Sequence, residues 1–507
     1  MKIKQIYPAA ALMLLVMSGS ASSQSVTFQG EAFVNKGLVG VARIPSTAVD
    51  DFGETLGGVG SGMAIDLKKW KKRHDGTYTG TLYMIPDRGW NTQGTTDFRG
   101  RLQRFDITLN PFYGAGPAGQ NQLTVRYRNS IIFYTWGGQP TTGLDPSGIR
   151  PPFFSNPELP IGPNGRVSFD GEAVVHVGDG TVWVSDEYGP YIYHYTLHGM
   201  LLHVIRPPDA FIPMRKDAAG NLVENFSANS PPRGVIYNPS PGNPLSGRQN
   251  NQGFEGLAMS PDRKTLFTLL QSALIQDLDP NSINTTRRNT RLLAYDLSHD
   301  QPRLVGEYVV QLPLYKNASN QTRIAAQSEF LALNDHQFLV LARDSSAGFT
   351  AAVSKSEYRR IDLIDIAGAT NIANTPYDKV GGSVAPVGVL NGAITPAKYQ
   401  SFLDMNDNAQ LNRFGLHNGD PNDKNDLYEK WESMAVVPVG DRNAPNDYFL
   451  FVGSDNDFIT TKGFMAGQPY SDIADVDSLI LVYRVTLPTY VRPLRERDDA
   501  DDSEADE

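Results

Sequence analysis

The chain lacks cysteine altogether. None of its 507 residues can form a disulfide, act as a thiolate nucleophile or bind zinc through sulfur. Positive charge is also scarce, because 45 Lys and Arg stand against 55 Asp and Glu, for a net charge of −10. This balance argues against general nucleic-acid binding, which needs a basic face. Beyond the N-terminus, no apolar run reaches the length of a membrane helix.

The N-terminus has the pattern of a secretory signal. Lys2 and Lys4 precede an apolar stretch over 9–17, and small residues follow at 18–23. The apolar stretch is too short to span a membrane. We therefore predict a signal peptide over residues 1–23 and a secreted mature protein. Without disulfides, such a protein must be stabilised by its core or by bound metal.

The C-terminal end has a different composition. The last 13 residues, from Arg495, contain eight acids and two arginines, which is typical of a solvated, disordered tail. We assign residues 24–490 to the folded domain and 491–507 to the tail. Four Asn-X-Ser/Thr triplets predict a glycoprotein with these asparagines on its surface: Asn225, Asn284, Asn317 and Asn320.

One short phrase recurs along the chain, and each full copy carries a glutamate. The copies span residues 169–175, 253–259, 327–333 and 430–436. A weaker copy at 60–65 has Ser61 in place of the acid. Internal repetition indicates structural units that stack or surround an axis. The glutamates of these copies are Glu172, Glu255, Glu329 and Glu432.

Each copy opens a similar series of short strands. Runs of β-branched and aromatic residues, broken by Gly and Asp, are typical of antiparallel strands. Units of about four such strands predict an all-β fold, a β-propeller with long inter-strand insertions. Five blades are readable, and we favour a sixth within 206–250 or 370–428. The early strand at 26–34 would pair with the last blade and close the ring.

In a propeller the start of each first strand and the end of each second strand lie on one face. The repeated glutamates stand at the starts of the first strands. The ends of the second strands hold further charged residues, for which we predict a catalytic role: Asp87, Arg88, Asp186, Glu187, Arg343, Asp344, Asp455 and Asp457. Both sets are expected to converge at one mouth of the central channel.

Several carboxylates in a confined space repel one another unless a cation relieves them. Ca²⁺ prefers six to eight oxygen ligands and suits an exported protein, so we predict a calcium site at the four glutamates. An alternative stays open. Each glutamate would then only accept hydrogen bonds from backbone amides, or pair with Arg88 and Arg343, and serve its own blade.

The segments 169–189, 253–261, 328–344 and 431–458 together resemble the phytase-like domain, the "esterase-like activity of phytase" family. The resemblance covers roughly residues 55–487 and implies an exported β-propeller that hydrolyses phosphate or carboxylic esters. We therefore expect a monomeric, metal-dependent hydrolase that acts on a small ester or phosphate substrate. The alternative function is a non-catalytic propeller that binds a ligand or partner.

Overall fold

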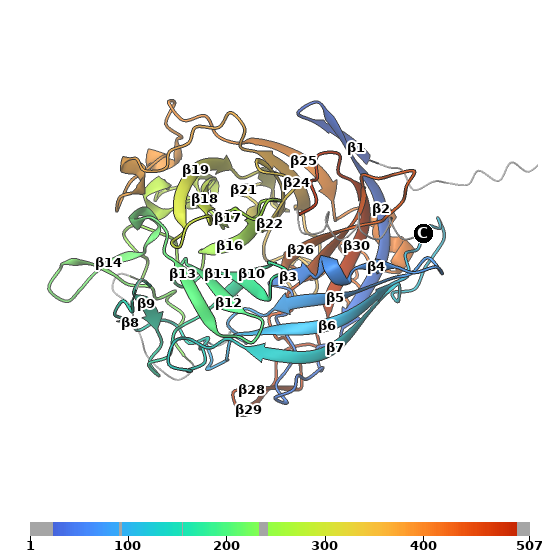
Figure 1. Cartoon of the computed structure of the whole chain (residues 1–507), viewed down its shortest axis with the longest axis horizontal. Coiled ribbons are helices and arrows are strands. Elements are labelled where there is room, and N and C mark those ends of the chain that lie inside the picture. The colour runs from blue at the N-terminus through green and yellow to red at the C-terminus, as the bar shows by residue number, and fades with distance from the viewer. Residues whose placement is uncertain (1–23, 91–93, 155, 233–241, 494–507) are drawn as a thin grey trace, which may run out of the picture.

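The computed structural model describes residues 24–90, 94–154, 156–232 and 242–493, and the structural statements below concern these residues. Five antiparallel sheets are arranged around a central axis (Figure 1). The all-β propeller is therefore confirmed, with the five blades that were readable in the sequence. Within each blade, neighbouring strands run antiparallel, and the connections between them range from short turns to long insertions.

Four of the five blades are built from consecutive strands. Blade 1 contains β3 (Gly62–Ile65), β5 (Tyr78–Ile85), β6 (Arg101–Leu109) and β7 (Leu123–Ile132), with β4 (Lys71–Lys72) beside β5. Blade 2 contains β10 (Gly171–His176), β11 (Thr181–Asp186), β12 (Ile192–Thr196) and β13 (Leu201–Ile205). Blade 3 contains β16 (Phe254–Met259), β17 (Thr265–Leu270), β18 (Asn289–Asp296) and β19 (Arg303–Gln311). Blade 4 contains β22 (Ala326–Ala332), β23 (Gln337–Arg343), β24 (Arg359–Asp365) and β25 (Lys398–Asp404).

Blade 5 combines the two ends of the domain. Its inner strands are β26 (Trp431–Pro438), β27 (Asp447–Ser454) and β30 (Ser478–Thr486). Its outer strands are β2 (Glu31–Ile44) and β1 (Gln24–Phe28). The pairing of β2 with β30 runs from Val34 opposite Thr486 to Ile44 opposite Ser478. An N-terminal strand thus pairs with the last blade, but the predicted strand at 26–34 is wrong in its bounds, because a turn at residues 29–30 divides it between β1 and β2 and most of the pairing lies after Val34.

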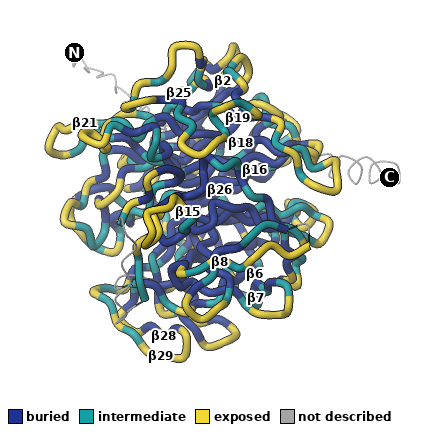
Figure 2. The backbone as a smooth tube through the Cα atoms, turned by 90° about the vertical axis from the view of Figure 1, so that its left-hand side faces the viewer, coloured by how far each residue is buried: buried dark blue, intermediate teal, exposed yellow. Residues whose placement is uncertain are grey.

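The innermost strands β3, β10, β16, β22 and β26 contact one another in that order, and β26 returns to β3. Five apolar clusters each join two neighbouring blades and form the core. Because the inward sides of the strands are apolar, burial of this surface holds the blades together. Figure 2 shows the exposed segments mainly at the rim, as loops around buried strands.

The favoured sixth blade is not formed in the described residues. The described residues of the region 206–250 contain two strands, the hairpin of β14 (Met214–Lys216) and β15 (Leu222–Glu224), which pair only with each other in a sheet. In the region 370–428 the one strand of the described structure, β25, is the fourth strand of blade 4. The other hairpins are β8 (Gly148–Arg150) with β9 (Leu159–Ile161), β20 (Leu314–Lys316) with β21 (Thr322–Ile324), and β28 (Gly463–Met465) with β29 (Gln468–Tyr470).

Helical segments are few and short. The α-helices are α1 (Ile283–Thr286) and α2 (Asn408–Leu411), and the 3₁₀ helices are Leu67–Lys69, Asp209–Phe211, Ile275–Asp277, Pro376–Asp378, Pro386–Gly388 and Asn412–Phe414. Within the described residues, no helix has the length and hydropathy required to cross a bilayer. The predicted signal peptide and nearly all of the predicted tail lie outside the described residues. Among the predicted glycan sites, Asn284 and Asn320 are exposed, whereas Asn225 is half-buried and contacts Arg215.

Candidate functional site: an acidic mouth of the central channel

A β-bulge interrupts the start of the innermost strand in four blades. The extra residue is Glu255 in blade 3 and Glu432 in blade 5, and Glu172 lies within the bulge of blade 2. A bulge leaves its extra residue out of the ladder and redirects the side chain. Burial raises the pKa of Glu172 well above its usual range, and the nearby charges of Glu255 and Glu432 raise it further. These three glutamates therefore converge, as predicted, at the face that we call the acidic mouth.

Glu329 departs from the prediction. In blade 4 the extra residue is Ser328, one position earlier, so Glu329 pairs regularly opposite Leu341. A shift of one residue turns a side chain to the other face of its strand. Glu329 Oε1 accepts hydrogen bonds from the backbone N–H groups of Phe330 (2.7 Å) and Leu257 (3.3 Å). The predicted set of four metal ligands must therefore be corrected by removing Glu329.

Three of the predicted catalytic acids surround a lysine. Lys430 Nζ lies 2.7 Å from both Asp455 and Asp457, and 3.5 Å from Asp87. It also lies 3.4 Å from Glu432. The three aspartates have the spacing of a metal site, but the ammonium group of Lys430 already supplies the positive charge that compensates them. We call this arrangement the lysine cluster.

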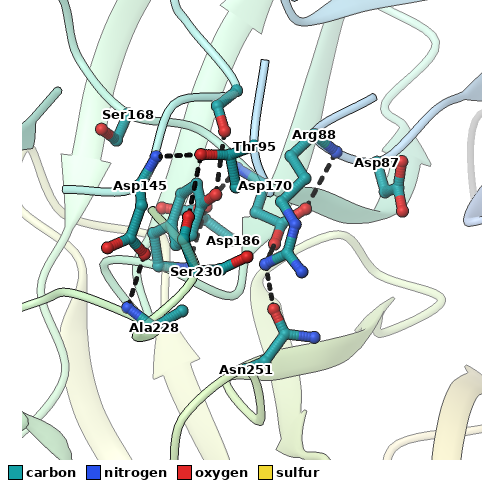
Figure 3. Close-up of polar contacts among 12 residues, drawn as sticks. Asp87, Arg88, Thr95, Asp145, Ser168, Asp170, Asp186, Ala228, Ser230 and Asn251 are labelled. Carbon is teal, nitrogen blue, oxygen red and sulfur yellow. Dashed lines mark hydrogen bonds and ion pairs between the residues drawn. The ribbon is translucent and has the colours of Figure 1, made fainter. Parts of the chain in front are cut away.

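A second group of acids lies beside blade 2. One carboxylate oxygen from each of Asp170, Glu172 and Glu187 lies within 4.8 Å of the other two, and all three residues are buried. We call it the carboxylate triad. Asp170 accepts two hydrogen bonds from Arg88, from its backbone N–H (2.9 Å) and from Nη1 (3.0 Å). Figure 3 shows the Arg88 guanidinium between Asp170 and Asn251, whose side chain it also contacts.

Buried hydrogen bonds connect the remaining glutamates to blades 3 and 4. Gln271 donates to Glu255, and Arg343 Nη2 donates to Glu432. Arg343 Nε also donates to Ser328 Oγ at 3.1 Å, so the bulge residue of blade 4 still takes part in the network. In blade 1, Ser61 Oγ donates to Asp455 at 3.2 Å. Every blade thus contributes one side chain to the polar network of the acidic mouth. That side chain comes from the bulge of the innermost strand or, in blade 1, from the equivalent position.

Two predicted catalytic acids instead hold backbone turns. Asp186 accepts hydrogen bonds from the backbone N–H groups of Asp170 (2.8 Å), Tyr188 (3.3 Å) and Gly189 (3.0 Å). Asp344 accepts from Ser356 Oγ and from the N–H of Glu357, both at 2.7 Å. Their oxygens are occupied by these donors, so neither residue belongs to the two acid groups, although Asp186 lies directly beside Asp170 of the triad.

Burial controls the protonation of the mouth. Burial and, next, the charge of the neighbouring Asp170 together raise the pKa of Glu187 to about 8. In the lysine cluster, burial raises the pKa of Asp455 to about 7 although Lys430 opposes this shift. Burial acts against the charge of Lys430, but the adjacent aspartates outweigh it and raise its pKa. Asp457 has a lowered pKa because its ion pair and hydrogen bond with Lys430 outweigh burial.

Three insertions lie against this mouth. The loop after β5 carries Trp90, which stacks on Tyr470 from the loop after β27 at a ring distance of 4.5 Å. From the insertion between β13 and β16, Arg248 Nη2 donates to the carbonyl of Tyr188 at 2.7 Å. Long insertions were predicted, but their packing over the mouth was not. They explain why the triad carboxylates are no more than 5% exposed.

Sequence reasoning missed Asp170 and Lys430 as site residues. Both belong to phrases that the sequence analysis singled out, because Asp170 lies two residues before Glu172 and Lys430 two before Glu432. The signal available was the local charge beside the repeated glutamate. The residue two positions before the glutamate differs from copy to copy, so comparison of the copies does not reveal this charge.

The chain belongs to the phytase-like family, described as "esterase-like activity of phytase", whose family model matches residues 70–458. An uncharacterized secreted protein of Arthroderma benhamiae is 43% identical over 461 residues, covering 84% of this chain and 88% of the relative. A luciferin-regenerating enzyme aligns at 11% identity over 85% of this chain and 92% of its own, with a TM-score of 0.25. Hydrazine synthase of Kuenenia stuttgartiensis aligns at 11% identity over 79% and 77%, with a TM-score of 0.27.

Proposed function

We propose that this chain is a secreted hydrolase of phosphate esters or small carboxylic esters that holds a divalent cation at its acidic mouth. The observation that carries the proposal is the carboxylate triad of Asp170, Glu172 and Glu187. Membership of a phytase-like, esterase-type family supports the reaction class, and the secreted relative supports the location. The proposal replaces the expected set of four glutamates by this triad.

The donor chemistry of the triad fits a hard cation. Its ligands are all carboxylate oxygens, which Ca²⁺ prefers. Glu187 Oε1 and the nearby Glu255 Oε2 are buried and lack a hydrogen-bond donor. A buried carboxylate oxygen without a donor is costly, and a bound cation relieves that cost. Once bound, such a cation polarises a phosphoryl or carbonyl oxygen and activates water.

The chain's own residues would position this chemistry. Arg88 fixes the orientation of Asp170 through two hydrogen bonds, and Arg343 fixes Glu432. Both arginines and Lys430 pair with carboxylates of the mouth, so these cations hold the acids in place. Asp457 has the most exposed side chain among the carboxylates that pair with Lys430, at 22%, and its lowered pKa keeps it ionised. Its accessibility makes it a candidate acceptor for a proton from attacking water, and its lowered pKa makes it a weak base.

Calcium binding and hydrolysis test the proposal together. Calorimetry on chelator-stripped protein is expected to show Ca²⁺ binding that Glu172→Gln weakens by about tenfold or more, because a charged ligand is lost. Glu329→Gln is the matched control and is expected to bind Ca²⁺ normally. Turnover of p-nitrophenyl phosphate, phytate or p-nitrophenyl esters should require the ion. Equal Ca²⁺ affinity for both variants would remove the triad from the proposal.

A structural cation is the second candidate, and the burial of the triad favours it. A closed coordination shell serves stability, whereas a catalytic site keeps a position open for water or substrate. This candidate predicts that EDTA lowers the melting temperature while no ester is hydrolysed with or without Ca²⁺. Turnover that depends on Ca²⁺, at a temperature where the stripped protein remains folded, would exclude it.

A further inference from the structure

A second candidate ligand site lies inside the channel, beyond the bulges from the acidic mouth. It is a cavity of about 150 Å³ to which all five innermost strands contribute. In four strands the lining begins after the bulge position or its equivalent, so the cavity and the mouth occupy different halves of the channel. Much of the lining is apolar, including Met63, Val174, Leu257, Met259, Leu331 and Met434.

Glu329 stands at the inner end of this cavity. It aligns with Gly256 of blade 3, one residue before the first lining residue of that strand, and it is 3% exposed. Two backbone N–H groups bind Oε1, as described above. In the described part of the chain, no lysine or arginine forms an ion pair with it. The cavity therefore has a carboxyl group without a counter-charge.

Most of the other polar groups that line the cavity are engaged or neutral, and the remaining cation, Lys68, is exposed. Asp66 pairs with Lys69 at 3.1 Å, and its Oδ1 accepts from the Lys68 backbone N–H. Arg263 donates to the carbonyl of Val177. Burial lowers the pKa of His176, whose ring stacks on Tyr83 at 5.1 Å, so it is neutral near pH 7. No lining cation is thus directed at Glu329.

The chain after β30 covers the outer end of the cavity. Tyr490, Val491 and Pro493 line it. The Val491 N–H donates to the carbonyl of Leu333 at 2.8 Å, and Tyr490 packs edge-on against Tyr448 at 4.8 Å. These contacts hold the segment from blade 5 across to blade 4. Entry to the cavity from this side requires the segment to move.

We propose that the channel cavity binds a small primary alkylammonium ion, with its ammonium group on Glu329 and its alkyl chain against the methionine, valine and leucine side chains. The volume suits this ligand, since a cavity of about 150 Å³ accommodates a six-carbon ring. A buried carboxylate is stabilised by an opposite charge in contact with it, and the two backbone N–H groups already favour the ionised form. No other described group supplies that charge.

Ligand binding should release a proton. Burial raises the pKa of Glu329 well above its usual range and so favours the protonated carboxyl group in the free protein. The bound state pairs a carboxylate with an ammonium ion, and the carboxyl proton passes to the buffer. Heat of binding will then depend on the ionisation enthalpy of the buffer, which distinguishes this ligand from a neutral one.

Calorimetry with butylammonium, hexylammonium and hexan-1-ol, in phosphate and in Tris at neutral pH, tests the site. We expect 1:1 binding of hexylammonium about tenfold or more tighter than hexanol, with buffer-dependent heat. Glu329→Gln should lose this preference for the cation. Glu172→Gln should retain it while losing Ca²⁺ affinity, so the two sites succeed or fail separately.

A cavity-filling variant tests the site independently in case Glu329→Gln does not fold. Ala332→Leu keeps the carboxyl group but occupies part of the lined space, and its urea midpoint reports whether the fold is intact. We expect it to weaken hexylammonium binding by about tenfold. The proposal is overturned if no saturable binding occurs up to about 10 mM, if the alcohol binds as tightly, or if folded Glu329→Gln binds like the parent protein.

Discussion

Replacing Lys430 by methionine should destabilise the protein strongly at neutral pH. The ammonium group contacts Asp455 and Asp457 at 2.7 Å each, and the Lys430 side chain is 17% exposed. At an effective dielectric constant of about 20, each contact is worth about 6 kcal/mol, and desolvation of the charges offsets several kcal/mol of this. Breaking a buried pair typically costs about 3–5 kcal/mol, because the partner charge stays buried without compensation. We expect a loss in that range.

The loss should shrink as the pH falls. Without the lysine, the folded-state pKa of Asp455, already raised to about 7, rises further, and that of Asp457 rises from its lowered value, so the folded variant binds more protons. Stability then increases as pH falls through those raised values. The gap between parent and variant should therefore be larger at pH 7 than at pH 5. Removing the cation leaves methionine to fill the same space, so little of the change comes from packing.

Urea unfolding in EDTA, at pH 7 and pH 5, measures the effect. The matched control is Lys36→Met, since Lys36 lies 2.7 Å from Asp447 but has a side chain 35% exposed. Asp447 keeps Arg484 as a counter-charge at 2.6 Å when Lys36 is removed, so this variant should be much less destabilising at either pH. If Lys430→Met were no more destabilising than Lys36→Met, the lysine would not be the counter-charge of the cluster.

Three further outcomes are expected. Burial lowers the pKa of His194 to about 4, so the folded protein should lose stability as the pH falls from about 6.5 towards 4. Relative to His194→Gln, the parent should lose about 1–2 kcal/mol of unfolding free energy between pH 7 and 4.5, measured by urea midpoints. Gly253→Ala places a Cβ 2.4 Å from the carbonyl oxygen of Glu187 and should lower Ca²⁺ affinity and melting temperature, whereas Gly392→Ala, with open space, should change neither. Lys430→Met should also gain a Ca²⁺-dependent rise in melting temperature, because it vacates three aspartates with metal spacing; an unchanged melting temperature would contradict this.

The propeller could be predicted because its strands have a recognisable local sequence pattern. Each blade begins with the same phrase and alternates apolar strands with Gly and Asp turns. The number of blades was harder to predict, since 206–250 and 370–428 are as long as a blade. Only pairing distinguishes an insertion from a blade, and β25 shows the difficulty, because it lies within the irregular stretch yet completes blade 4.

The site was predicted in outline and misassigned in detail. The acids gather at one mouth because strand starts and strand ends meet there, which depends on topology alone. Glu329 was misassigned because aligning the phrases by their glutamates hides a bulge that falls one residue earlier, at Ser328. The position of the bulge depends on the pairing of β22 with β23, and the sequence of β22 alone does not indicate it. The partners of Arg88 and Lys430 likewise depend on loops brought together from distant segments.

Closure of blade 5 by β2 and β30 has a consequence for how the chain folds. Val34 and Thr486 are neighbours in space, so the ring closes only when both ends of the domain have been synthesised. Until then β27 lacks its partner β30, and the apolar surface between blades 5 and 1 stays exposed. Contacts between such distant segments form slowly because the intervening loop must be ordered first. Residues 24–44 form the two outer strands of blade 5, so their loss would leave β30 as an unpaired edge of that blade.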